Sequence, residues 1–459
     1  RDLHLSIRRQ RQMCIRDRNM STHNQIQELR KQYLSPSLSL SYNEPIHMVR
    51  GEGQYLYDNE GKRYLDAVNN IQHVGHCHPK VVSAAKKQNA LLNTNTRYLD
   101  ETIVRYAKLL TNKLPDGLDV CFFTNSGSES NDLALRIARC ITGSKETIVL
   151  DGAYHGHLSS LIEISPYKHN AVGGSGPPNF VHSIPLPDSF RGIYRGDNCS
   201  DDYVNELKNV ISKINDSGKP LSAFIVEALM GCGGQIVLPE GFLKKSFELI
   251  RESGGLCIAD EVQIGFGRMG TDFWGFETCN VTPDIVTLGK SIGNGHPLSA
   301  VITSKEIADQ FNNGMEYFNS YGGNPVSCAI GEAVLQVIED EALQKNAEKV
   351  GNYLIEELIK LQSQCRFIGQ VRGQGLFIGI ELIYNNDALK PNHTLAKRVA
   401  NEMKDAGILI SVDGPDHNVL KIKPPMVFNI ENANAVSYTH LRAHETLRYL
   451  VCRRLREKK

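Results

Sequence analysis

The stretch Leu256-Cys-Ile-Ala-Asp260 has the short apolar pattern of a buried strand, and Ile285-Val-Thr-Leu288 repeats this pattern just before Gly289-Lys290. Amphipathic segments alternate with such runs from about residue 118 to 310, which predicts an α/β domain built on a largely parallel sheet. The other strands expected in this domain are Val120–Thr124, 147–150 and 223–227, and the expected helices are 129–139 and Phe242–Glu252.

Residues 345–435 have a different pattern, which predicts a separate α+β unit. A long helical pattern opens this unit, and a Pro-rich strand closes it at residues 421–425. Between them we expect a Gly-rich strand around 372–382 and a helix near 395–406. Residues 55–68 predict a β-hairpin that joins the same unit.

Length and composition narrow the class of protein. The chain has 459 residues, enough for two or three packed units. No window approaches the roughly 18 uninterrupted apolar residues of a membrane helix, so we expect a soluble protein with no membrane partner. Its eleven cysteines show no Cys-x-x-Cys or Cys/His spacing, which indicates a reduced, intracellular compartment and no metal site.

Both ends of the chain are strongly basic. Residues 1–18 contain six arginines, and residues 437–459 contain seven lysines or arginines. An Arg-rich, acid-poor start is typical of a transit peptide, and basic ends can also bind nucleic acid. Because both ends resemble translated adapter sequence, we expect neither to be native, and we expect no nucleic-acid partner. The compartment stays open between mitochondrion and cytoplasm.

Polar residues follow the predicted strands at their carboxyl ends, where ligands collect in open α/β sheets. After Thr124 comes Asn125-Ser-Gly-Ser-Glu129, a helix start whose free N–H groups can bind a phosphate, with Gly127 allowing close approach. Taken alone, this turn is equally an ordinary N-cap. After Leu150 come Tyr154 and His155 in the same cleft, and Tyr154 can stack on a flat ring or simply pack.

Asp260 and Lys290 complete this set. A carboxylate that ends an apolar strand is tolerable when it faces a cation, such as a protonated pyridine nitrogen. Lys290 has glycines on both sides, and partial burial there lowers the pKa of an amine and makes it a nucleophile. Taken alone, Asp260 can equally be a capping residue and Lys290 a surface lysine. With the phosphate turn and the aromatic platform, they match the needs of pyridoxal 5'-phosphate (PLP): a phosphate grip, a stacked ring, an electron sink and a Schiff-base lysine.

Three motifs make a resemblance specific: Ile258-Ala-Asp-Glu-Val-Gln-Ile-Gly-Phe-Gly-Arg268, Thr287-Leu-Gly-Lys290 and Tyr321-Gly-Gly-Asn-Pro325. Over about residues 40–435 the chain resembles class III aminotransferases, which are fold-type I PLP enzymes. The resemblance implies a large domain with a mostly parallel seven-stranded sheet and a smaller α+β domain. The expected segments are a non-native leader (1–18), an N-terminal part of the small domain (19–85), the large PLP-binding domain (86–340), the C-terminal small domain (341–435) and a non-native tail (436–459).

The same resemblance implies roles for single residues. Lys290 and Asp260 are catalytic, and Asp260 binds the ring nitrogen. The other expected cofactor contacts are Gly127 and Ser128 at the phosphate, Tyr154 and His155 at the ring, Gln263 near the phenolic oxygen, Glu227 at the back wall and Ser320 at the phosphate across a dimer interface. Arg372 matches an arginine that grips a substrate carboxylate, a task suited to a planar guanidinium. The protein is therefore expected to be a homodimer or a dimer of dimers with shared active sites.

The expected substrate is a small-molecule amine. Segments at residues 69–79, 92–98, 157–168 and 420–426 resemble the subgroup that contains ethanolamine-phosphate phospho-lyase and phosphohydroxylysine phospho-lyase. In that subgroup phosphate is the leaving group, and Arg97 and Lys168 are candidates to bind it, or are surface or dimer-contact charges. The alternative reaction is transamination to pyruvate or glyoxylate, because both reactions need the same lysine and aspartate.

Two other classes of protein fit the sequence less well. A non-catalytic protein of PLP fold is disfavoured because Asp260 and Lys290 are both present. A nicotinamide-dependent dehydrogenase lacks its Gly-x-Gly-x-x-Gly motif after a first strand. The chain also departs from the family pattern at Ser130, where members usually carry Ala, and at Gly152, where they usually carry His.

Overall fold

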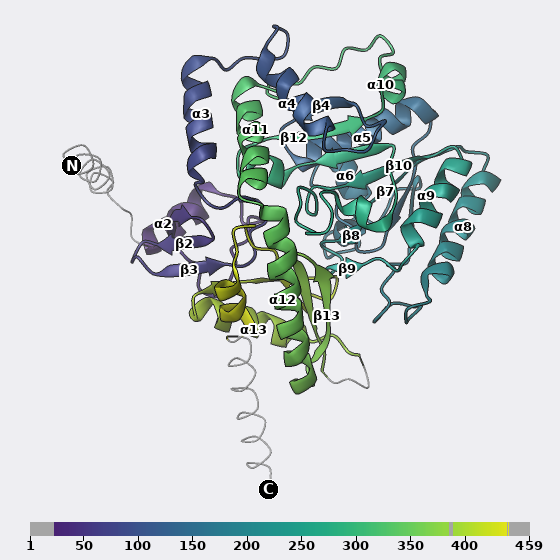
Figure 1. Cartoon of the computed structure of the whole chain (residues 1–459). Helices are drawn as coiled ribbons and strands as arrows, with labels where there is room; N and C mark the ends of the chain where they lie inside the picture. The colour runs from purple at the N-terminus through teal and green to yellow at the C-terminus, as the bar shows by residue number, and fades with distance from the viewer. Residues whose placement is uncertain (1–22, 385–388, 438, 440–459) are drawn as a thin grey trace.

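Seven strands form the large sheet of the computed structural model, which describes residues 23–384, 389–437 and 439 (Figure 1). Strand β12 runs antiparallel to both of its neighbours, and the other strands run parallel to one another. The order across the sheet is β4 (Val120–Thr124), β12 (Ser299–Thr303), β11 (Ile285–Leu288), β10 (Leu256–Asp260), β7 (Leu221–Val226), β5 (Glu146–Leu150) and β6 (Val181–Ile184). The predicted α/β class and mostly parallel seven-stranded sheet are confirmed.

Alternating side chains of the central strands serve two separate cores. In β7, Ala223 and Ile225 pack against helix α5 (Gly127–Thr142) on one face of the sheet. Phe224 and Val226 lie on the other face and pack against α8 (Ser200–Asp216) and α9 (Phe242–Glu252). A strand buried on both faces explains why the sequence shows continuous apolar runs and not alternation.

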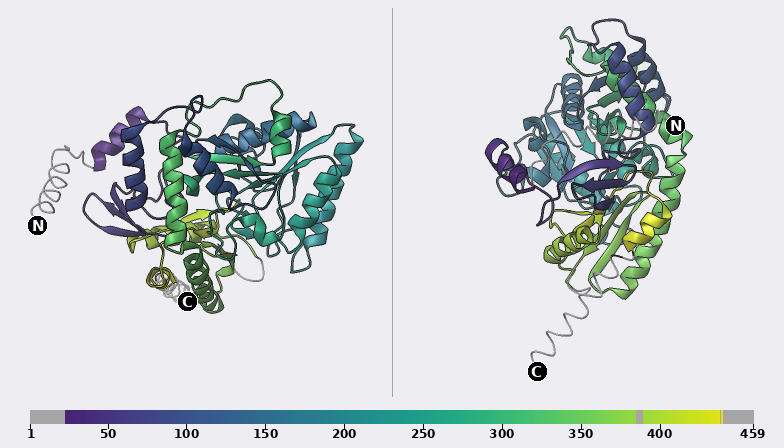
Figure 2. Two further views of the ribbon diagram at one scale, coloured as in Figure 1. Left: turned by 45° about the horizontal axis from the view of Figure 1, so that its top comes forward. Right: turned by 90° about the vertical axis from the view of Figure 1, so that its left-hand side faces the viewer.

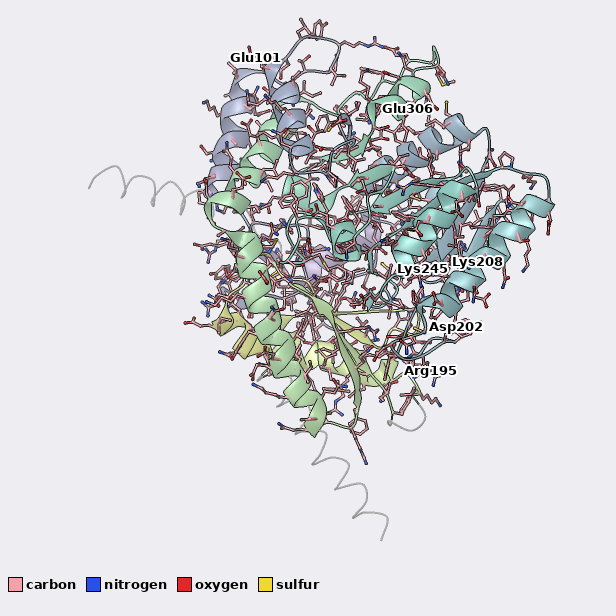
Figure 3. All side chains as sticks on the ribbon, turned by 45° about the vertical axis from the view of Figure 1, so that its right-hand side comes forward. Glu101, Arg195, Asp202, Lys208, Lys245 and Glu306 are labelled. Carbon is pink, nitrogen blue, oxygen red and sulfur yellow. The ribbon has the colours of Figure 1, made fainter. Side chains whose placement is uncertain are left out.

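The helices that cover the sheet keep their charged residues outside. Figure 3 shows Asp202 and Lys208 of α8 and Lys245 of α9 projecting from the surface, together with Glu101 and Glu306. In the part of the chain that the structure describes, none of the helices combines the length and the apolar character needed to cross a bilayer.

The C-terminal residues form a second layer below the large sheet in Figure 1. An antiparallel sheet has the order β13 (Ile368–Gln374), β14 (Phe377–Leu382), β17 (Val419–Ile422) and β16 (Ser411–Asp413). Helix α12 (Leu343–Gln364) packs on it, and α13 (His393–Asp405) lies beside it. Helix α11 (Pro325–Asp340) leads directly into α12 along one side of the molecule, which links the two layers (Figure 2).

An N-terminal hairpin reaches the same region. It consists of β2 (Tyr55–Asp58) and β3 (Arg63–Asp66), and β3 pairs in parallel with β15 (Ile408–Leu409). The remaining elements are α2 (His23–Tyr33), β1 (Met48–Glu52), α3 (Pro79–Leu91), α4 (Glu101–Thr111), α6 (Ser159–Glu163), α7 (Pro166–His169), β8 (Leu229–Met230), β9 (Ile236–Val237), η1 (Gly275–Cys279), η2 (Lys290–Gly293) and α10 (Lys305–Phe311).

Two predicted strands differ from the structure. The single strand expected around 372–382 is a tight pair, β13 and β14, which turns at Gly375 with φ +53°. The closing strand expected at 421–425 is β17, which ends at Ile422 because Pro424 and Pro425 have no N–H to pair. The expected leader at 1–18 lies outside the described residues, as does most of the expected tail.

Candidate active site

The carboxyl ends of five parallel strands meet at one edge of the large sheet. Because β4, β5, β7, β10 and β11 all end there, the residues that follow them share a site. These residues are Gly127 and Ser128 after β4, Tyr154 and His155 after β5, Glu227 after β7, Gln263 after β10 and Lys290 after β11.

Asp260 lies at this edge as a buried carboxylate, only 4% exposed. Its Oδ2 accepts hydrogen bonds from His155 Nδ1 and Asn131 Nδ2, both at 2.8 Å, and its Oδ1 accepts one from the Val262 N–H at 3.1 Å. Asn131 also donates to the His155 carbonyl at 2.7 Å, so it fixes both partners. Sequence reasoning missed Asn131, although it lies one helical turn after Gly127 and therefore on the same face of α5.

Lys290 begins η2 immediately after β11, with a positive φ of +41°. Such a left-handed conformation is unusual for a lysine and often marks functional sites. No hydrogen bond or ion pair engages its ammonium within the described residues. The preceding Gly289 packs on α5, since a Cβ there would lie 3.0 Å from the Gly127 Cα. A close glycine contact therefore holds the lysine beside the start of α5.

The N-terminus of α5 offers free N–H groups to an anion. Ser126 caps the helix by accepting a hydrogen bond from the Glu129 N–H, and the Ser128 hydroxyl contacts His157 Nδ1 at 3.0 Å. Ser130, which departs from the family pattern, donates to the Leu288 carbonyl at 3.0 Å. This extra hydroxyl ties α5 to the strand end that carries Lys290.

An aromatic group lies on the next strand end. The half-buried Tyr154 ring contacts Tyr167 edge-on, with centroids 6.3 Å apart, and the Lys168 ammonium lies 5.7 Å from its centroid. Burial raises the pKa of Tyr154 above its usual value. Gly152 has φ +75°, so the histidine usual in the family would be strained at this position.

Glu227 and Gln263 belong to a polar chain that reaches the smaller layer. Gln263 Nε2 donates to Glu227 Oε1 at 3.4 Å, and Gln263 Oε1 accepts from Asn70 Nδ2 at 3.3 Å and from Lys423 Nζ at 3.2 Å. Burial, followed by repulsion from Asp260, raises the pKa of Glu227 to about 7. Glu227 is therefore partly protonated near neutral pH.

Arg372 is held by the protein itself. Its guanidinium is buried and forms an ion pair with Glu381, and it also donates to the Gly234 carbonyl (2.7 and 2.9 Å) and to Gln370 (2.8 Å). This geometry disfavours the expected grip on a substrate carboxylate, because almost every N–H donor is already used.

Two predicted residues lie on the surface of the single chain. Ser320 is exposed, beside the exposed Phe318 and Tyr321. Arg97 pairs with Glu316 at 3.0 Å and covers the Phe318 ring, so its charge is already balanced. In the described structure, neither side chain is hydrogen-bonded to the residues around Asp260.

The residues of the site fit PLP. A capped helix start suits its phosphate, Tyr154 suits its ring, the buried Asp260 suits a protonated ring nitrogen, and Lys290 has a free amine for its aldehyde. Within the described ranges, no group of three His, Cys, Asp or Glu side chains is arranged to hold a metal ion.

Known proteins share this sequence and fold. The family described as aminotransferase class-III matches residues 39–439. A Drosophila melanogaster protein named alanine–glyoxylate aminotransferase 2-like is 49% identical over 89% of this chain and 84% of its own length. A Caenorhabditis elegans protein named ethanolamine-phosphate phospho-lyase homolog 1 is 41% identical over 90% of this chain and 92% of its own.

Among solved structures, a phospholyase from Arthrobacter in complex with phosphoethanolamine is similar, with a TM-score of 0.87 and 38% identity over 91% of this chain and 99% of that one. The chain therefore belongs to the class III aminotransferases. It is a PLP-dependent enzyme of fold type I.

Proposed function

We propose that this chain is a phospho-lyase that eliminates phosphate and ammonia from a phosphorylated amine, either phosphoethanolamine or 5-phosphohydroxylysine. The observation that carries the proposal is the similarity, over nearly the whole chain, to the Arthrobacter phospholyase with phosphoethanolamine. The similarity to the C. elegans phospho-lyase homolog supports the same substrate class.

When bound, PLP supplies an electron sink for the carbon that carries the amine. In the proposed reaction, Lys290 Nζ removes a proton from that carbon. The electron pair forms a double bond to the neighbouring carbon, whose C–O bond breaks, and phosphate leaves with the bonding electrons. The proton held by Lys290 is returned to the carbon that lost phosphate, one water molecule is consumed in releasing ammonia, and the final products are an aldehyde, ammonia and inorganic phosphate.

The other residues bind and orient. Asp260 keeps a proton on the ring nitrogen, and His155 and Asn131 hold Asp260 in place. The start of α5 with Gly127 and Ser128 binds the cofactor phosphate, and Tyr154 stacks on the ring. We propose Gln263 as the neighbour of the phenolic oxygen, with Glu227 behind it.

Transamination is the second candidate, because the Drosophila relative is named as an aminotransferase. The same lysine and aspartate would serve it. The two reactions differ in whether a keto acid such as pyruvate or glyoxylate must accept the amino group.

A homodimer is part of the proposal. Large apolar side chains are exposed around Ser320 and along the neighbouring segments, where a partner subunit could cover them. They include Leu91, Leu92, Tyr98, Leu99, Val104, Met315, Phe318 and Tyr321. In such a dimer, Ser320 would reach the partner's cofactor phosphate. An intracellular location, mitochondrial or cytoplasmic, stays a prediction from the sequence.

The test is to incubate the PLP-loaded enzyme with each phosphorylated amine, without a keto acid, and to measure inorganic phosphate. Release from either substrate, lost in Lys290→Ala and kept in Lys245→Ala, is the expected result. Turnover that occurs only after pyruvate or glyoxylate is added to an amine donor would make the chain a transaminase instead.

A further inference from the structure

Lys423 is a cation buried at the site with few partners. Its side chain is 2% exposed, and its Nζ lies 3.6 Å from the nearest carboxylate oxygen, Asp413 Oδ2. The same Nζ donates one hydrogen bond, to Gln263 at 3.2 Å, and lies 4.2 Å from the centre of the Phe377 ring. A lysine has three N–H donors, so this buried ammonium retains donors for another acceptor. Burying a charge is costly, and a second anion nearby would offset that cost.

A second lysine faces the same carboxylate. Lys421 lies within β17 and Lys423 is the first residue after it, and the ammonium groups of both approach Asp413 Oδ2. Its Nζ lies 3.4 Å from Asp413 Oδ2, and its side chain is 25% exposed. Asp413 also accepts a hydrogen bond from Gln235 Nε2 at 3.1 Å. Two cations therefore share one carboxylate, and among the described residues the next carboxyl group, Glu227, is joined to Lys423 only through Gln263.

The lysine pair is adjacent to the catalytic edge of the large sheet. Gln263 connects Lys423 to Glu227, and Gln263 follows Asp260 by three residues. Because β17 belongs to the smaller sheet, the pair approaches this edge from the opposite layer. A small anion held by the two lysines would lie between the layers, beside the place where the amine substrate reacts.

We propose that Lys421 and Lys423 bind the phosphate of the phosphorylated amine substrate. This inference rests on the proposed phospho-lyase function and names the part of the site that recognises its substrate. A phosphate monoester carries a charge of about −1.5 to −2 near neutral pH, so it needs more than one cation. Asp413 keeps the two ammonium groups together, and their charge stabilises the negative charge that develops as phosphate leaves.

The pair is better suited to this task than the two cations that sequence suggested. Arg97 is engaged by Glu316 on the surface. Lys168 is exposed and lies over the rings of Tyr154 and Tyr167, at 5.7 and 5.4 Å. Neither has the buried, partly unpaired ammonium that Lys423 provides.

The test measures equilibrium binding to the PLP-loaded enzyme from the change in cofactor absorbance. The probes are 2-aminoethylphosphonate, whose C–P bond prevents loss of phosphate, ethanolamine and β-alanine. We expect Lys421→Met and Lys423→Met each to weaken phosphonate binding about tenfold or more, the loss expected for a charge-assisted hydrogen bond. Binding of ethanolamine should change less than about threefold, since it has no anion. Lys245→Met, on the outer surface of α9, is the control, and Lys423→Gln replaces Lys423→Met if that variant does not fold.

Three results would overturn the assignment. Equal weakening of phosphonate and ethanolamine would give the lysines a structural role only. Equal weakening of phosphonate and β-alanine would make the pair a carboxylate site. A loss confined to Lys168→Met would move the phosphate to that residue. Because no turnover is measured, lysine-dependent phosphonate binding by an enzyme that releases no phosphate would contradict the proposed function and would still show that the two lysines bind the phosphonate group.

Discussion

His155 Nδ1 lies 2.8 Å from Asp260 Oδ2, and both side chains are shielded from solvent. The carboxylate accepts this bond, so the imidazole donates it from Nδ1. The other ring nitrogen, Nε2, is buried with no hydrogen-bond partner in the described structure. His155 is thus a positioning residue: it holds Asp260 in place, and Asp260 is the residue assigned to the ring nitrogen of PLP.

Replacing His155 with Phe should weaken PLP binding by about tenfold or more, because a buried carboxylate loses one of its donors. Asn at this position keeps a donor and should restore part of the affinity. The measurement is the cofactor absorbance retained after dilution. The control is His182→Phe, because His182 contacts Glu146 and not Asp260. Equal PLP affinity of the two variants would show that His155 does not position Asp260.

Glu227 should make the apoprotein less stable as the pH rises. Burial raises its pKa from the usual value of 4.5 to about 7, so the folded chain binds this proton more tightly than the unfolded chain. The stabilisation is complete below pH 4.5 and is lost as the pH rises to about 7. Glu261, with a pKa raised by burial to about 8, adds a loss of the same sign. Glu227→Gln should therefore lose less stability between pH 5.5 and 8.5 than the wild type in urea unfolding. Identical pH profiles of the two proteins would contradict the prediction.

Gly127 should not tolerate a side chain. A Cβ there would lie 2.8 Å from Val262 Cγ1, so Gly127→Ala should cost about 1–3 kcal/mol of unfolding free energy through overpacking. Val262→Ala removes the atoms in the way. The double variant should therefore lose less stability than the sum of the two single changes, as measured by urea unfolding of the apoprotein. Strictly additive losses of unfolding free energy would show that the two side chains do not contact each other.

Much of this site was predictable because its residues lie at the ends of predicted strands. Asp260 and Lys290 each come directly after an apolar run, and parallel strands end at the same edge of a sheet. Together with the phosphate turn and Tyr154 they indicated the cofactor, and the class III motifs added the family; both are confirmed. The local sequence was therefore sufficient to predict Asp260, Lys290 and the cofactor.

Contacts between distant segments were not predictable in the same way. Lys423 reaches Gln263 across 160 residues, and no spacing rule links them. Arg372 pairs with Glu381 through a hairpin that the sequence presented as one strand, so its partner was hidden. Side-chain burial, which separates Lys423 from an ordinary surface lysine, appears only in the folded chain.

A dimer should form through the exposed apolar surface near Leu99. We expect the wild type to sediment as a dimer and Leu99→Asp to sediment as a monomer, since a charge at an apolar interface is costly. The monomer should also retain PLP less well, because the partner's Ser320 is lost. A control, Lys245→Asp, lies on a different face and should remain dimeric. Dimeric Leu99→Asp would place the interface elsewhere.

Chemical trapping identifies the lysine that binds PLP. Borohydride converts a lysine–aldehyde linkage into a stable amine, and peptide mass spectrometry then locates the added group. We expect the label to lie on Lys290, and we expect Lys290→Ala to acquire none. A label on Lys423 or any other lysine in the wild-type protein would contradict it.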